Sequence, residues 1–548
     1  MKNHLSLLTA CACTAFLMCS CGSKQADDAR DFDPPIMGWS SWNYFHTEIS
    51  EEVICGQADA LISTGLADAG YKYVNIDDGF TDGRGEDGRI RIDTTKFPNG
   101  MKAVADYVHS LGLKAGMYSD AGDNTCASRD VNPYGLNVGL YGHEVEDCKM
   151  MFDEWGYDFF KVDNCGGRHL DLDEKTQFTK IAEALAQCDN KNINFNVCRW
   201  VFPGTWVREI ADSWRTTHDI WVDWGSVKTI IKENMYLVAY CGEGHYNDLD
   251  MLEIGMGFPP EVERTHMACW CIQSSPLVVG CDLYKMPDYS IEFLKNADLI
   301  AMDQDRLGIA APVVQKEGEV YVFAKDMEQF YGPKRAVVVS NLSDEPATIN
   351  VSLAAIGFQG TVQVYDCFQH LDRHDLSRSE YFTVKLDPHD SGAFFVTGER
   401  IEKSVYQGEE AFLNAYTEIN DQDYEVYRRP YEIPSPRYWE SPSADLGLYA
   451  TKLGGWEENW LEWQHVYSME GGDYVMSIRY ACADKRNMSL SVNGKDVHEF
   501  VGLDSRGELD WSEIDVKISL KKGWNKIRLS NPEAPMPSID RMSLKKFE

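Results

Sequence analysis

The chain of 548 residues is 44% hydrophobic and 12% aromatic, which is enough apolar material for about two to four domain cores. Its 87 acidic residues against 52 basic ones give a formal net charge of −35. Because such a surface repels polyanions, we expect no nucleic-acid partner.

The N-terminus predicts an export signal. Lys2 precedes an apolar stretch over residues 5–18, which is too short to cross a bilayer of about 30 Å as a helix. Residues 1–21 resemble a bacterial lipoprotein signal, in which Cys21 becomes the lipidated first residue; simple secretion is the alternative. One acyl anchor and a polar tether over residues 22–33 would hold the protein at the periplasmic or cell-envelope membrane without embedding it.

Residues 34–307 alternate between strand-like runs and helical patterns. In the helical pattern over residues 100–112, Met101, Val104 and Val108 fall on one face. Eight repeats of strand then helix predict a closed parallel (β/α)8 barrel, or TIM barrel. The expected strands cover residues 36–39, 71–76, 113–118, 157–162, 193–197, 214–217, part of 236–250, and 277–280.

After residue 307 the pattern changes to short alternating strands without crossover helices, which is typical of antiparallel sheets. We expect an antiparallel β-sandwich domain over residues 308–400 and a further C-terminal β-sandwich module over residues 401–548. In that module, Asn493 and Gly494 separate two alternating runs and predict a type I′ hairpin turn.

Charged side chains close several of the expected barrel strands, at the end of a parallel barrel where active sites lie. Each pair alone is also typical of solvated loops, structural ion pairs or helix caps, but their joint placement favours a functional site. The residues are Asp77 and Asp78 after the second strand, Tyr118 and Asp120 after the third, Lys161 and Asp163 after the fourth, and Arg215 and Asp219 after the sixth.

Two positioned carboxylates are sufficient to hydrolyse a glycosidic bond, one of them ionised and the other carrying a proton to the leaving oxygen. Asp163 suits the ionised role, because Lys161 lies two residues earlier on the same side of the strand and lowers its pKa. Asp219 requires partial burial and nearby negative charge to keep its proton.

Eight segments resemble, in chain order, the motifs of glycoside hydrolase family 27, the family of α-galactosidases and α-N-acetylgalactosaminidases. The resemblance covers about residues 34–396. The segments are PPIMGWSSWNYF, NIDDGF, MYSDAGDNTC, FFKVDNC, SWRTTHDI, HYNDLDMLEIG, SPLVVGCDL and DQDRLG.

The resemblance implies hydrolysis with retention through a covalent glycosyl-enzyme, without metal or organic cofactor. It implies Asp163 as nucleophile and Asp219 as acid/base. A charged acceptor fixes an axial hydroxyl and an indole offers a flat face to the sugar, although Trp42 would alternatively be a core aromatic. The implied substrate-binding residues are Asp77 and Asp78 at O4 and O6, Lys161 at O3 and O4, Arg215 near O2, and Trp42, Tyr118, Asp250 and Met251 as pocket walls.

The resemblance also implies a disulfide between Cys126 and Cys165 beside the nucleophile. The usual partner of Cys198 is replaced by Ala211, so we expect a free thiol at Cys198. We expect buried thiols at Cys148, Cys188 and Cys241. No cysteine pairs have zinc spacing, and we expect no metal site.

One motif departs from the family pattern. Relatives carry Cys-Glu-Trp or Cys-Ser-Trp where this chain has Cys198, Arg199 and Trp200. The glutamate form goes with galactose, and the serine form, with a small residue three positions on, goes with N-acetylgalactosamine. Arg199 would donate near O2 and remains compatible with galactose, whereas the bulk of Phe202 argues against an acetamido group.

These features predict an exo-acting retaining α-galactosidase that acts on oligo- or polysaccharides. The alternatives are a β-L-arabinopyranosidase or α-N-acetylgalactosaminidase of the same family, and a sugar-binding protein without catalysis. The segment from Tyr406 onward resembles a carbohydrate-binding module of family 6 or 35, whose tryptophans would stack on sugars or pack in the core. They are Trp456, Trp460, Trp463 and Trp524. The oligomeric state is not predicted.

Overall fold

The computed structural model describes residues 32–131, 136–373, 380–417 and 435–547. The predicted signal over residues 1–21, with Cys21, lies outside the described residues, as does most of the predicted tether. Within the described part of the chain, no helix is both long and apolar enough to span a bilayer.

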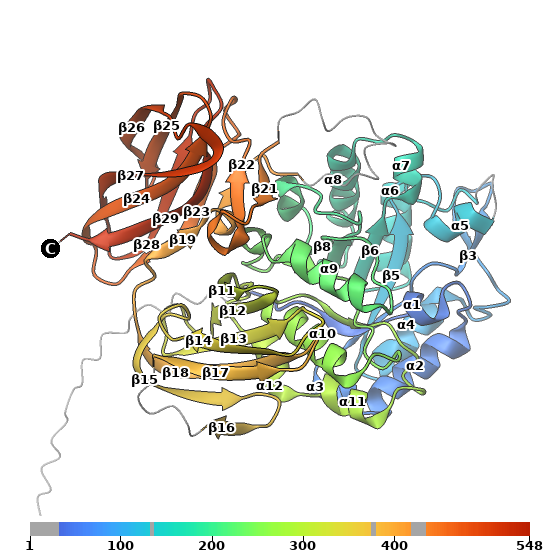
Figure 1. The fold of residues 1–548 in the computed structure, drawn as a ribbon. Helices are drawn as coiled ribbons and strands as arrows, with labels where there is room; N and C mark the ends of the chain where they lie inside the picture. The colour runs from blue at the N-terminus through green and yellow to red at the C-terminus, as the bar shows by residue number, and fades with distance from the viewer. Residues whose placement is uncertain (1–31, 132–135, 374–379, 418–434, 548) are drawn as a thin grey trace, which may run out of the picture.

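Eight parallel strands form the predicted barrel (Figure 1). The sheet order is β10-β1-β2-β5-β6-β7-β8-β9, and a parallel bridge from Leu252 to Val279 closes it. The fold prediction is therefore confirmed, including all eight expected strands. They are β1 (Met37–Ser40), β2 (Tyr73–Asn75), β5 (Lys114–Asp120), β6 (Phe159–Asp163), β7 (Asn194–Val197), β8 (Ser213–Arg215), β9 (Tyr246–Asp248) and β10 (Leu277–Val279).

Helices surround the barrel (Figure 1). In α4 (Gly100–Ser110) the buried face includes Met101, Val104 and Val108, as the helical period predicts. The other α-helices are α1 (Trp42–Phe45), α2 (Glu51–Ser63), α3 (Leu66–Ala69), α5 (Cys126–Val131), α6 (Glu144–Lys149), α7 (Cys165–His169), α8 (Glu174–Leu185), α9 (Trp224–Asn234), α10 (Pro260–Ile272), α11 (Asp288–Leu294) and α12 (Ala297–Asp303). A hairpin of β3 (Thr81–Arg84) and β4 (Ile90–Ile92) extends the loop after β2.

An antiparallel β domain follows the barrel and packs against α10 (Figure 1). Its larger sheet has the order β11-β12-β13-β18-β15-β16, and β14 pairs with β17 in a second sheet. Alternating apolar residues such as Val322, Val337 and Val351 form its own core. The strands are β11 (Val313–Glu317), β12 (Val320–Asp326), β13 (Lys334–Asn341), β14 (Ala347–Ser352), β15 (Phe358–Asp366), β16 (Leu371–Arg373), β17 (Tyr381–Leu386) and β18 (Ser391–Arg400).

The C-terminal module is a second antiparallel sandwich, with sheets β21-β22-β29-β24-β27 and β20-β23-β28-β25-β26, and β19 paired to β29. Asn493 and Gly494 both have positive φ, 54° and 75°, which confirms the type I′ hairpin. The strands are β19 (Val405–Gln407), β20 (Phe412–Leu413), β21 (Arg437–Glu440), β22 (Leu448–Thr451), β23 (Leu461–Ser468), β24 (Gly472–Cys482), β25 (Arg486–Val492), β26 (Lys495–Leu503), β27 (Gly507–Leu520), β28 (Gly523–Ser530) and β29 (Ser538–Lys546).

Three of the four tryptophans proposed for this module take part in packing. Trp463 is only 2% exposed and its indole N–H donates to the carbonyl of Gln407 at 2.8 Å. Trp460 lies 3.7 Å under the Arg528 guanidinium. Trp524 packs edge-on against Phe330 of the β domain, with ring centroids 4.8 Å apart.

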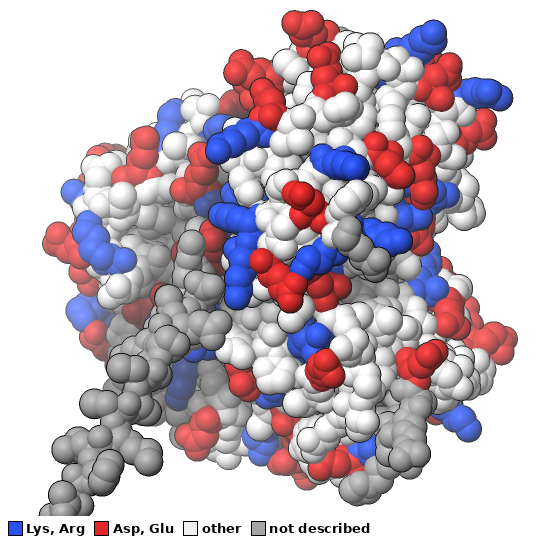
Figure 2. Space-filling model, turned by 90° about the vertical axis from the view of Figure 1, so that its left-hand side faces the viewer, with Lys and Arg blue, Asp and Glu red and all other residues white. Residues whose placement is uncertain are grey.

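Acidic and basic side chains are interspersed on the face shown in Figure 2. Among the described residues, this face therefore carries no large area of a single charge sign (Figure 2).

Candidate active site

The polar residues predicted at the strand ends come together at one end of the barrel. Parallel strands end on the same side of their sheet, so residues that follow different strands converge there. A cavity of about 30 Å³ inside the barrel is lined by six of the predicted binding residues: Asp77, Tyr118, Lys161, Arg215, Asp250 and Met251.

Asp163, the last residue of β6, is held mainly through one oxygen, and the buried Cys198 thiol also acts on its carboxylate as a hydrogen-bond donor. The Tyr118 hydroxyl donates to its Oδ2 at 2.8 Å, and the Cys126 sulfur lies 3.5 Å from the same oxygen. Oδ1 is buried and has no hydrogen-bond partner among the described residues. A buried carboxylate oxygen without a hydrogen-bond partner destabilises the fold. A nucleophile requires such an oxygen, because a partner would compete with the attack.

Lys161 lies between two carboxylates. Its Nζ donates to Asp77 Oδ2 at 2.9 Å. Burial lowers the pKa of Lys161, but Asp77 and Asp163 together raise it well above the ordinary value, so the side chain stays a cation. Burial raises the pKa of Asp163, and the Lys161 charge opposes this rise. The predicted influence of Lys161 is confirmed in sign, although it does not outweigh burial.

Asp78 is fixed by the loop that follows β5. Its carboxylate accepts from the Thr125 hydroxyl at 3.0 Å, from the Ala127 N–H at 2.9 Å and from the Gly79 N–H at 2.8 Å. Burial raises the pKa of Asp78 to about 6, against these hydrogen bonds. The neighbouring Asp77 adds to the rise, so the Asp-Asp pair of the sequence acts as one electrostatic unit.

Arg215, 2% exposed, connects the acid/base candidate to the pocket wall. Its Nη1 lies 3.0 Å from Asp219 Oδ1 and its Nη2 lies 2.8 Å from Asp250 Oδ2. The Asp219 side chain is 52% exposed and lies against the Arg215 cation. The expected nearby carboxylates are present, since Asp219 acts electrostatically on both Asp163 and Asp250; that Asp219 carries a proton in the resting protein stays a prediction.

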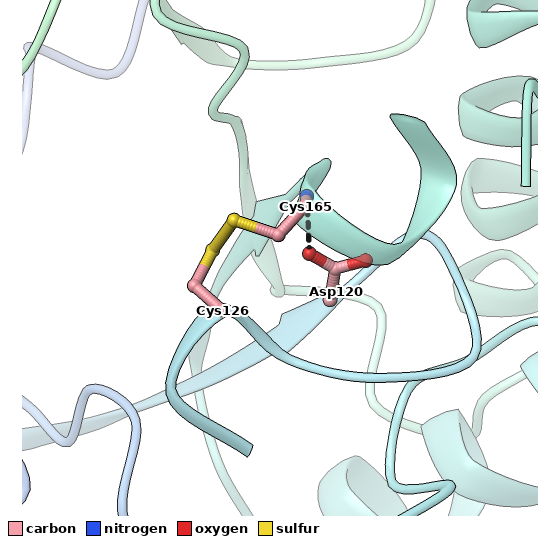
Figure 3. Close-up of side chains that lie close together, drawn as sticks. All are labelled: Asp120, Cys126 and Cys165. Atoms are coloured by element: carbon pink, nitrogen blue, oxygen red, sulfur yellow. Dashed lines mark hydrogen bonds between the residues drawn. A yellow bond between two sulfur atoms is a disulfide. The ribbon is translucent and has the colours of Figure 1, made fainter. Parts of the chain in front are cut away.

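The predicted disulfide between Cys126 and Cys165 is confirmed (Figure 3), and its Cys126 sulfur lies next to Asp163. Asp120, at the end of β5, supports it: one carboxylate oxygen accepts from the Cys165 N–H at 2.6 Å and the other from the Gly166 N–H at 3.0 Å. Burial raises the pKa of Asp120 to about 8. Both sulfurs are in the disulfide, so this cluster does not supply three metal ligands.

Cys198 has a free, buried thiol, as expected from Ala211 in the usual partner position. Its sulfur lies 3.7 Å from Arg215 Nη1. Cys148, Cys188 and Cys241 are also buried thiols, which confirms that expectation.

An ion pair with Glu174 connects Arg199 to the segment that follows β6. Its Nε donates to Glu174 Oε2, and the other Glu174 oxygen accepts from Asn164 Nδ2 at 3.1 Å. Asn164 is the residue after the nucleophile. The guanidinium that replaces the family glutamate is therefore balanced by a carboxylate from α8.

The expectation for Phe202 was wrong. Its side chain is fully buried and packs against Tyr240 and Tyr416, with ring centroids 4.6 and 5.4 Å away. Tyr416 belongs to the segment that leads into the C-terminal module. Since Phe202 has no exposed surface, its bulk does not decide whether an acetamido group is accepted.

Met251 lines the cavity, whereas Trp42 is not among the lining residues and lies in the helix that follows β1. Trp42 begins α1 and is half-buried, with its ring against His46 at 5.4 Å, so the alternative of a core aromatic is not what the structure shows. Met251 is 6% exposed and its N–H is held by Asp250 Oδ1 at 2.8 Å.

Sequence reasoning missed several polar residues of the site. Asn196 Nδ2 donates to Asp248 Oδ2 at 2.9 Å, and Asp248 Oδ1 accepts from the Asp250 N–H at 2.9 Å. The Asp-Leu-Asp sequence at the end of β9 was the available signal, but the uncertain bounds of that strand hid it. Glu174 had no signal, because it reaches the site from a helix.

Comparisons with known proteins agree with this geometry. Residues 34–305 match the family described as Alpha galactosidase A, and residues 317–396 match its C-terminal β-sandwich domain. An α-galactosidase from Cyamopsis tetragonoloba is 38% identical over 66% of this chain and 86% of its own length. Alpha-galactosidase A from Cellvibrio japonicus is 35% identical over 64% of this chain and 83% of its length. The crystal structure of α-galactosidase I from Mortierella vinacea has a TM-score of 0.61 and 26% identity, and covers 68% of this chain and 98% of that one.

Proposed function

This chain belongs to the α-galactosidase family, glycoside hydrolase family 27, and we propose that it removes terminal α-linked galactose from oligo- or polysaccharides with retention of configuration. The observation that carries the proposal is the state of Asp163. Its Oδ2 is held by Tyr118 while its buried Oδ1 has no partner among the described residues.

The proposed reaction has two displacements. In the first, Asp163 Oδ1 attacks the anomeric carbon while Asp219 gives its proton to the departing glycosidic oxygen, which leaves a galactosyl ester on Asp163. In the second, Asp219 takes a proton from water, the water oxygen attacks the same carbon, and the ester bond breaks to regenerate Asp163. Lys161, Asp77 and Asp78 hold the sugar hydroxyls, as the resemblance implies.

The charge beside Asp163 and the exposure of Asp219 fit these roles. Lys161 opposes the protonation of Asp163, which keeps the nucleophile ionised over a wider pH range. Arg215 holds Asp219 at 3.0 Å, and the 52% exposure of this side chain gives it access to both a leaving group and water.

Aryl glycosides test the proposal. We expect rapid hydrolysis of an aryl α-galactoside, with the α-anomer of galactose as the first product seen by NMR. A β-anomer would contradict retention. Faster hydrolysis of an aryl β-L-arabinopyranoside, or of an aryl α-N-acetylgalactosaminide, would replace galactose as the assigned sugar.

We also propose that the chain is exported and anchored through a lipid on Cys21, and that its C-terminal module binds carbohydrate. The sequence of residues 1–21 and the likeness to family 6 and 35 modules support these two proposals. Cys21→Ser is expected to move the protein from the membrane to the soluble fraction. Co-sedimentation of the full chain carrying Asp163→Asn with insoluble galactose-containing polysaccharides tests the module.

A further inference from the structure

An exposed tryptophan lies two residues after the acid/base. Trp221 is 70% exposed, although it is a large apolar side chain of the kind that is usually buried. It follows β8 in the loop that ends at α9, on the catalytic side of the barrel.

The backbone that carries Trp221 is held on both sides. The Ile220 N–H donates to Asp250 Oδ2 at 2.7 Å, and Asp250 belongs to the site. The Trp221 N–H donates to Ser226 Oγ at 3.0 Å, and its carbonyl accepts from the Asp223 N–H at 2.7 Å. The exposed indole is therefore carried by a fixed backbone. Because this backbone is already ordered, less conformational entropy is lost when a ligand binds.

Asp219 and Trp221 point to the same space. The residue between them, Ile220, is 4% exposed, whereas Asp219 and Trp221 are both exposed. The carboxylate of Asp219 and the indole of Trp221 both line one open groove of about 470 Å³.

This placement determines what the groove can hold. An acid/base gives its proton to the oxygen that links galactose to its neighbour, so the neighbouring sugar must lie beside Asp219. A pyranose presents axial C–H groups that stack on a flat aromatic face, and the hydroxyls at its rim stay in water. The groove beside Asp219 has a volume of about 470 Å³, which is large enough for a pyranose ring.

We propose that Trp221 is the platform for the leaving-group sugar, and that the preferred substrates carry galactose on another pyranose. This inference rests on the proposed α-galactosidase function. It assigns to Trp221 the selection of the part of the substrate that leaves, whereas the residues of the barrel interior select galactose.

The experiment compares two substrates of the full-length protein. α-Galactosyl fluoride has no leaving-group sugar, whereas raffinose has one. Trp221→Ala is expected to lower kcat/KM for raffinose about tenfold and to leave kcat/KM for α-galactosyl fluoride within about twofold of the wild type. Trp221→Phe, which keeps an aromatic face, is expected to restore most of the raffinose activity.

Val222→Ala is the matched control, since Val222 is exposed next to Trp221 but does not line the groove; it is expected to change neither rate. Equal losses with both substrates would show that Trp221 acts on the fold of the loop, and unchanged rates would show that no sugar binds there. Either result overturns the inference. Wild-type protein that does not hydrolyse α-galactosyl fluoride would instead refute the proposed function.

Discussion

The mouth of the barrel and the interface between the β domain and the C-terminal module use polar and aromatic side chains in different ways. At the mouth, Asp163 Oδ1 and Arg215 Nε are buried without partners among the described residues. At the interface, formed by Phe330, Tyr331, Tyr467 and Trp524, rings pack against each other, and Tyr331 stacks on Tyr467 with centroids 4.1 Å apart.

The difference separates residues that do chemistry from residues that join domains. An unpaired buried polar atom destabilises the fold by about 1–3 kcal/mol, and at the mouth of the barrel a bound sugar would supply the missing partners. An aromatic ring that is surrounded by other rings uses its surface for packing contacts. We therefore expect substitutions at the mouth to change rates, and substitutions at the interface to change stability.

The largest effect is expected from Asp163→Asn. An amide cannot form the glycosyl ester, so kcat for an aryl α-galactoside should fall by at least about 10³-fold while the thermal unfolding temperature stays close to the wild-type value. Asp158→Asn is the control, because Asp158 precedes the same strand at its other end and binds His109 at 2.8 Å. Retained activity in Asp163→Asn would remove the nucleophile assignment.

A smaller effect with a distinct signature is expected from Lys161→Met. Lys161 opposes the burial that raises the pKa of Asp163, so its loss raises that pKa further. The ionised nucleophile then disappears at a higher pH as the solution is acidified, and the acid limb of the kcat/KM profile moves to higher pH. The measurement is a pH–rate profile with an aryl α-galactoside.

Lys161 also binds Asp77, so a drop in kcat/KM of about 100-fold is expected at the optimum pH. The Lys161→Arg variant keeps the charge and should keep the acid limb near its wild-type position. An acid limb that stays in place in Lys161→Met would show that this cation does not control the charge of Asp163.

The barrel and most of the mouth could be predicted from sequence, because apolar runs set the strands and parallel strands bring their ends together. Asp77, Lys161 and Asp163 needed only that rule. Residues that reach the mouth from other elements, such as helices, could not be predicted from this rule about strand ends. Glu174 reaches Arg199 from the first turn of α8.

Phe202 shows a second limit of the sequence. Its position in the motif was expected to place it at the sugar, but the C-terminal segment around Tyr416 covers it. A contact between residues over 200 positions apart leaves no periodic pattern in either segment. The 52% exposure of the Asp219 side chain could not be predicted either, although its ion-pair partner Arg215 lies only four residues away.

Phe202→Ala tests whether the packing of Phe202 against the C-terminal segment around Tyr416 affects the site. Removing a fully buried phenylalanine is expected to destabilise the protein by about 3–4 kcal/mol and to loosen the loop that carries Arg199. At temperatures below the midpoint of thermal unfolding, we expect kcat/KM for an aryl α-galactoside to fall a few-fold. Phe202→Leu, which keeps most of the volume, should lose about 1 kcal/mol and keep its rate. A rate unchanged in Phe202→Ala would show that the contact between Phe202 and the C-terminal segment around Tyr416 does not affect the site.

The smallest effect on rate is expected from Trp524→Ala, at the interface itself. Trp524 contacts Phe330 and Tyr331 of the β domain and Tyr467 of its own module, and it is half-buried. Its loss should destabilise the protein by about 2 kcal/mol in denaturant unfolding, with kcat for raffinose unchanged. Trp439→Ala is the control, since Trp439 is 52% exposed and should cost less than about 0.5 kcal/mol. If Trp524→Ala instead lowered kcat and left stability unchanged, this tryptophan would belong with the residues of the mouth, and the separation between packing and chemistry would fail at its clearest point.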